Sequence, residues 1–175
     1  MVSKRRLVAI LVATLPFVGL ALERAAAQNA ANGPAHIDQR SYDLGGTAAF
    51  AEMVEVGVKR LAFSSTLLSA DMTALLPDAT RIANEHHVLL FREPDLIVTD
   101  LFPADVARGK EVLLIYKGST LDAYMDLKRQ KAVLVKSSAY TGEAREQIAR
   151  RLGKLLSYPE PAIDALLRKN AAARE

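Results

Sequence analysis

The chain contains no cysteine and no tryptophan, and only 6% of its residues are aromatic. The lack of cysteine excludes disulfide bonds, thiolate metal sites, a Cys nucleophile and a lipidated N-terminal Cys. Because half of the residues are hydrophobic but few are aromatic, the core must be largely aliphatic. A domain of this kind is held together by apolar packing alone.

An excess of charge of one sign is also missing once the first 27 residues are set aside. The chain has 23 Lys and Arg against 20 Asp and Glu, and residues 1–27 hold four of the basic and one of the acidic residues. The remainder therefore carries 19 of each and no net charge. This balance argues against a basic footprint for nucleic acid or an anionic membrane surface.

Residues 1–27 have the pattern of a secretory signal peptide. Lys4, Arg5 and Arg6 precede an apolar run over residues 7–22, and three alanines follow at residues 25–27. Basic, apolar and small-residue segments in this order predict export, with cleavage after Ala27. The protein is then periplasmic or secreted.

Three alternatives remain for this segment. Cleavage after Ala30 or Ala31 fits the same pattern. An uncleaved anchor would leave the chain on the membrane, although the apolar run is short for a full span. Arg5-Arg6 also leaves twin-arginine export beside the favoured general secretory route.

Removing 27 of the 175 residues leaves 148, enough for one ordinary domain. Residues 28–46 lack an apolar period and predict a flexible lead-in. Residues 47–170 predict a single α/β domain, and residues 171–175 a frayed tail.

The first half of the domain alternates helical and strand patterns. A helix capped by Thr47 is expected to stop at Gly57, because glycine adopts the left-handed helix cap without strain. Residues 58–64 then predict a strand, although one longer helix through Leu61 is the alternative. The next helix begins near Ser69 and is expected to break near Leu76, ahead of Pro77.

The remaining strands and helices complete the predicted fold. Apolar runs at residues 88–91 and 96–101 flank a turn and predict a β-hairpin. Residues 112–116 predict a buried central strand, parallel to strand 58–64 by the crossover preference. The expected fold is a small α/β domain with a four-stranded mixed sheet, flanking helices and a helical C-terminal half. Its last helices are expected at residues 121–135, 143–157 and 162–169.

The strand end at residues 117–120 is the best candidate for a binding site. Lys117, Gly118, Ser119 and Thr120 lie where a strand passes into a helix, and exposed N–H groups at a helix start bind anions. If the two strands are parallel, Ser64, Ser65 and Thr66 lie at the same edge, and both hydroxyl-rich loops can hold a phosphate or carboxylate. The alternative is purely structural, a turn glycine with an N-cap hydroxyl.

His86 and His87 form the only histidine pair. Adjacent side chains point to different sides of a helix, so they are poor joint ligands, and we predict neither a metal site nor a cofactor. A helix-end cap and a surface residue explain the pair.

The segment Leu152-Gly-Lys-Leu-Leu-Ser-Tyr-Pro159 resembles the LG-x-LLGYP segment of a group of uncharacterised prokaryotic proteins. Two cysteines commonly follow it there, whereas Glu160-Pro161-Ala162 follows here. The resemblance covers about a dozen residues and implies no activity.

Two functions fit these observations best. The first is an exported soluble binding or accessory module that contacts a small anionic ligand or a protein partner. The alternative is a small hydrolase or transferase acting on an anionic substrate between Ser64–Thr66 and Lys117–Thr120. A third hypothesis makes the helical half an oligomer interface.

Overall fold

The computed structural model describes residues 38–102 and 104–172. Residues 1–37, which include the predicted signal peptide and most of the predicted lead-in, lie outside this range. Within it, three strands form one sheet: β1 (Leu61–Phe63), β2 (Leu89–Glu93) and β3 (Val112–Tyr116). The strand order is β1-β3-β2, and β3 runs antiparallel to both neighbours.

This sheet corrects three predictions. It has three antiparallel strands in the described residues rather than four in a mixed sheet. Strand β1 pairs antiparallel with β3, with Leu61 opposite Tyr116 and Phe63 opposite Leu114. The helix Ser69–Glu85 connects β1 to β2, and these two strands run in the same direction. Strand β3 lies between them in the sheet. The crossover rule therefore applied to a different pair of strands.

The predicted hairpin is also wrong, because residues 96–101 form no strand. Leu96, Ile97 and Leu101 are buried, but part of the backbone of this segment forms hydrogen bonds with side chains instead of a neighbouring strand. The N–H of Ile97 donates to Tyr124 Oη at 3.2 Å, and Lys131 Nζ donates to the carbonyl of Val98 at 2.6 Å. An apolar run signals burial, and side-chain partners can replace the ladder of a strand.

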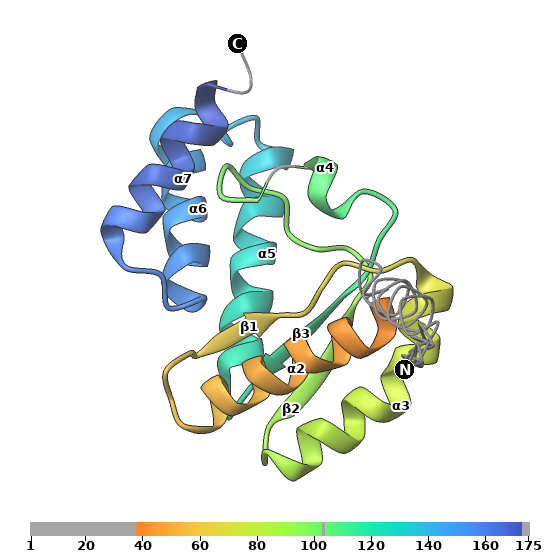
Figure 1. Ribbon diagram of the computed structural model, residues 1–175. Coiled ribbons are helices and arrows are strands. Elements are labelled where there is room, and N and C mark those ends of the chain that lie inside the picture. Colours follow the sequence, from red (N-terminus) through yellow and green to blue (C-terminus); the bar gives the residue numbers. More distant parts are fainter. Residues whose placement is uncertain (1–37, 103, 173–175) are drawn as a thin grey trace, which may run out of the picture. The chain divides into compact units, whose positions relative to one another are not determined.

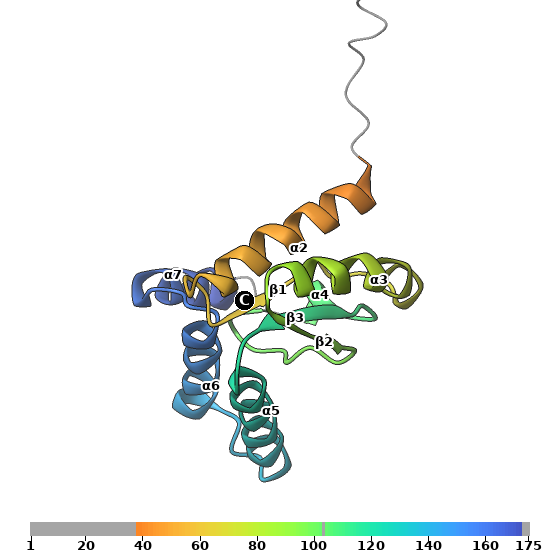
Figure 2. The ribbon, with the colours of Figure 1, turned by 90° about the horizontal axis from the view of Figure 1, so that it is seen from below.

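Helices α2 (Gln39–Glu55) and α3 (Ser69–Glu85) cover one face of the sheet, as Figures 1 and 2 show. Helix α2 begins earlier than predicted, because the Asp38 side chain caps it by accepting from the N–H of Ser41 at 3.0 Å. Residues 39–46, predicted as lead-in, are thus helical. Helix α3 continues through Pro77, since its buried stripe packs on the sheet on both sides of the proline.

The opposite face of the sheet carries the helical C-terminal half, which the sequence predicted. It consists of α5 (Thr120–Lys136), α6 (Gly142–Leu155) and α7 (Glu160–Ala172), and a single turn, α4 (Ala104–Ala107), precedes β3. Strand β3 is buried along its whole length. Leu113 and Ile115 pack toward α2 and α3, whereas Val112, Leu114 and Tyr116 join the larger core with α5–α7.

Four helices end in the same backbone motif. The residue after the C-cap has positive φ at Gly57, His87, Ser138 and Ser157. After α3, α5 and α6, its N–H and the next one bond back to the last turn as in a Schellman motif. Of these four helix ends, only the one at Gly57 could be predicted from a glycine in the sequence. The other three positions adopt the left-handed conformation without glycine.

Candidate functional site

The two predicted halves of the anion site lie at opposite ends of β3. Because β1 and β3 are antiparallel, Ser64 follows β1 beside Leu113, near the start of β3. Lys117 follows the far end of β3, beside Leu61. The structure therefore does not bring Ser64–Thr66 and Lys117–Thr120 to one edge.

The segment 117–120 makes local structural contacts. Gly118 has φ of +56°, which glycine adopts readily, and the hydroxyl of Thr120 donates to the carbonyl of Lys117 at 2.9 Å. Lys117 Nζ donates to the carbonyl of Glu55 at 3.3 Å. Ser119 is the N-cap of α5 but makes no side-chain capping bond. This arrangement matches the structural alternative given above.

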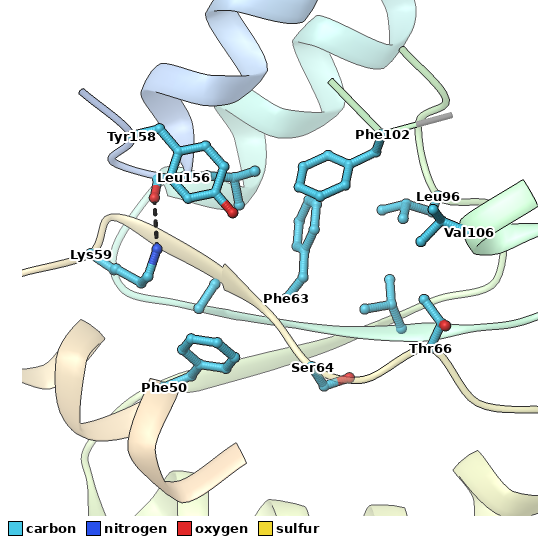
Figure 3. A pocket seen from close by; sticks show the side chains of 12 residues that line it. Phe50, Lys59, Phe63, Ser64, Thr66, Leu96, Phe102, Val106, Leu156 and Tyr158 are labelled. Atoms are coloured by element: carbon cyan, nitrogen blue, oxygen red, sulfur yellow. Dashed lines mark hydrogen bonds between the residues drawn. The ribbon is translucent and has the colours of Figure 1, made fainter. Parts of the chain in front are cut away.

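Ser64 and Thr66, in contrast, line a pocket. The pocket encloses about 180 Å³ between β1, the loop before α4, and the turn between α6 and α7. Figure 3 shows Lys59 and Tyr158 on one side of it, Thr66 and Val106 on the other, and Phe63 and Phe102 between them. Most of its lining is apolar: Phe50, Ala62, Phe63, Leu96, Phe102, Val106, Val112 and Leu156.

Aromatic rings form the central wall of the pocket. Phe63 and Phe102 have ring centroids 5.9 Å apart, and Phe63 meets the buried Tyr124 edge-on at 6.2 Å. These tilted and edge-to-face contacts are favourable for aromatic pairs and fix the ring orientations. The wall is therefore preformed.

Lys59 supplies the positive charge of the site. Its Nζ donates to the carbonyl of Leu156 at 2.9 Å and lies 5.0 Å from the ring centroid of Tyr158 and 5.9 Å from that of Phe50. Burial lowers the pKa of this ammonium group, because desolvation disfavours the charged form. Burial likewise raises the pKa of the Tyr158 phenol.

The α6–α7 turn that carries Tyr158 is fixed by residues 152–159. Gly153 is buried, and a Cβ there would lie 2.7 Å from two side-chain atoms of Ile163 on α7. Ser157, the residue before Tyr158, has φ of +62°. The direction of this turn therefore depends on close α6–α7 packing at Gly153 and on a left-handed residue at Ser157.

A second polar cluster lies behind the pocket wall and is internally satisfied. The buried Glu93 accepts from Lys128 Nζ at 3.1 Å through each carboxylate oxygen and from the N–H of Asp95 at 2.8 Å. Burial, and secondarily Glu93, raises the pKa of Tyr124. This cluster anchors the irregular segment before α4.

The histidine pair converges on one carboxylate, contrary to the expected divergence. Glu55 accepts from Nδ1 of His86 at 2.8 Å and of His87 at 3.2 Å. The positive φ of His87 turns its side chain back toward the same side. Among the residues described, no group of three His, Asp or Glu side chains is placed to hold a metal ion.

Comparisons with protein-family models, curated proteins and solved structures gave no significant match. No helix in the described part of the chain is long and apolar enough to span a membrane.

Sequence reasoning missed the residues that build the pocket walls. Phe50, Phe63, Phe102 and Tyr158 account for four of only ten Phe and Tyr residues in the chain. In a sequence so poor in aromatic residues, each of these four side chains was a candidate for a shared core or pocket, although they come from four separate segments. Lys59 carried no comparable signal, since its position depends on the distant α6–α7 turn.

Proposed function

We propose that the protein is an exported binding module that takes up a small apolar molecule in the pocket walled by Phe63 and Phe102. The main support for this proposal is the preformed aromatic wall of the pocket, which has a volume of about 180 Å³. Ligand sites are concave and mostly apolar, with a few polar groups that orient the ligand. Lys59, Tyr158 and Thr66 provide those polar groups, whereas the Ser64 hydroxyl is bonded to the main chain of Ser65 and Leu113.

The volume restricts the size of the ligand. A cavity of about 150 Å³ holds one benzene molecule, whereas drug-sized ligands need about 300 Å³ or more. A hollow of about 180 Å³ suits a single ring or a short branched aliphatic chain. Larger molecules would have to extend past the rim.

The location is proposed from residues 1–27, whose basic, apolar and small-residue segments are typical of exported proteins. Export would place the pocket in the periplasm or outside the cell. The enzyme hypothesis loses its main support, since its two hydroxyl-rich loops lie at opposite ends of β3.

A titration with toluene, followed by amide chemical shifts of the full-length protein, tests the proposal. Shifts are expected at residues along β1 and around Phe102 and Tyr158, and they should saturate. Val106→Trp should abolish them, because Val106 is a partly exposed pocket residue whose enlargement fills the hollow. Val133→Trp, at an exposed valine of α5 away from the pocket, is the matched control.

Saturable shifts that disappear in Val106→Trp and persist in Val133→Trp would support the proposal. Scattered, non-saturating shifts, or equal binding by both variants, would contradict it.

A further inference from the structure

We infer that the natural ligand of this pocket is a small aromatic or branched carboxylate whose anionic group pairs with Lys59. The inference rests on the proposed binding function and adds the chemical class of the ligand. It follows from three features of Lys59: its place at the pocket, its unused donors and the absence of a balancing charge.

Lys59 is fixed at the pocket by several contacts. One N–H donates to the carbonyl of Leu156 at 2.9 Å, and the rings of Tyr158 and Phe50 lie 5.0 and 5.9 Å from Nζ. An ammonium group has three donors, so two remain available. A cation held against aromatic faces in this way loses little freedom when it binds an anion.

No carboxylate balances this charge within the described residues. Arg92, Lys128, Arg145 and Arg150 each have an acidic partner within 4 Å, whereas Lys59 has none there. A partly buried cation without an anion is unfavourable, and a ligand carboxylate would relieve that cost. Burial, which lowers the pKa of Lys59, reflects the same cost.

The dimensions suit a ring with one short acidic arm. An aromatic ring packed against Phe63 and Phe102, which contact each other, leaves its acidic arm free to reach Lys59 on the side that Figure 3 shows next to Tyr158. A carboxylate adds Coulomb attraction between full charges to the hydrogen bond, which a neutral amide cannot do, so the ammonium group should discriminate a carboxylate from an amide.

Three probes separate this inference from the proposed function: phenylacetate, its neutral analogue phenylacetamide, and toluene. The affinity of each is measured by the same amide-shift titration. Phenylacetate is expected to bind at least about tenfold more tightly than phenylacetamide, the ratio typical of a hydrogen bond to a charged partner. Lys59→Met should reduce this ratio to near one, whereas Lys59→Arg should retain most of it.

Lys131→Met is the matched control. Lys131 also donates to a main-chain carbonyl, lies 5.3 Å from a Tyr ring centroid and has its pKa lowered by burial. It does not line the pocket. This variant should therefore keep the phenylacetate preference.

A pH series tests the role of Lys59 in the unmodified protein, so its result does not depend on whether a variant folds. Phenylacetate affinity should be constant at neutral pH and fall as the pH rises through the lowered pKa of Lys59, while toluene affinity should not change. Tyr158 is the only other lining residue that titrates. Because burial raises its pKa, its phenol stays neutral up to a higher pH.

The outcomes are distinct. Tight phenylacetate binding that depends on Lys59 and pH supports the inference. Equal binding of phenylacetate and phenylacetamide, with no effect of Lys59→Met, overturns it but leaves the binding function standing. Failure of all three probes to bind in the pocket overturns both.

Discussion

The main-chain N–H of Arg60 donates to Oγ of Ser157 at 2.9 Å, across 97 residues of chain. This bond and the parallel contact of Lys59 with the carbonyl of Leu156 join the start of β1 to the α6–α7 turn. They place the Lys59 ammonium group beside the Tyr158 ring. The geometry of the pocket therefore depends on how α6 and α7 are packed.

Replacing Gly153 by Ala should destabilise the protein by about 1–3 kcal/mol, the usual cost of overpacking a core. The new methyl group would lie 2.7 Å from Cδ1 and Cγ1 of Ile163 and force α6 and α7 apart. Urea unfolding measures the change. Gly45→Ala is the control, because nothing lies within 4 Å of its Cβ position inside α2, and it should stabilise by about 0.5–1 kcal/mol. Equal stability of Gly153→Ala and the parent would contradict the packing account.

Ser138→Gly should raise the free energy of unfolding by about 1 kcal/mol. Ser138 is exposed and has φ of +57°, a conformation that costs a residue with a Cβ about 1–2 kcal/mol and glycine almost nothing. Thermal unfolding gives the comparison. The adjacent Ser137, with φ of −89°, should gain nothing from the same substitution. A gain at Ser137 and none at Ser138 would argue against a left-handed cap here.

Lys128→Met should cost about 2–3 kcal/mol, near the lower end for a broken buried ion pair because Lys128 is partly exposed. It leaves the carboxylate of Glu93 buried without its cation. Arg129→Met, which removes an exposed ion pair with Asp126 on the same helix, should cost at most about 0.5 kcal/mol. If both variants unfold at the same denaturant concentration, Glu93 is not the buried anchor described above.

Much of this architecture was predictable, and the part that was not depends on pairing between distant segments. The buried strand 112–116, the stop at Gly57 and the three C-terminal helices follow from local apolar spacing and cap residues. The direction of β1 does not, since an uninterrupted buried strand has no face pattern that distinguishes parallel from antiparallel neighbours.

In the candidate site, too, some residues were predictable from local sequence and others depend on contacts between distant segments. Ser64 and Thr66 were expected near a ligand and do line the pocket. Their expected partner Lys117 lies at the other end of β3 and does not line the pocket, whereas Lys59, which precedes β1, does. Contacts with Leu156 and Tyr158, which lie about a hundred residues further along the chain and which no local pattern encodes, hold that ammonium group at the pocket.

Glu55→Gln should weaken the acid sensitivity of the protein. Hydrogen bonds from His86, and then His87, hold the pKa of Glu55 below its usual value of 4.5. A carboxyl group whose pKa is lower in the folded state contributes stability above its unfolded pKa and loses it as the pH falls through the folded one. The unfolding free energy of the parent should therefore decline more steeply below about pH 4.5 than that of Glu55→Gln. Parallel slopes for the parent and Glu55→Gln would contradict a stabilising interaction between Glu55 and the two histidines.

A crystal structure of the protein grown with phenylacetate tests the central claim most directly. The account predicts density for the ring packed against Phe63 and Phe102, with a carboxylate oxygen about 2.7–2.9 Å from Lys59 Nζ. An empty pocket at saturating phenylacetate, or a ligand bound elsewhere on the surface, would contradict it.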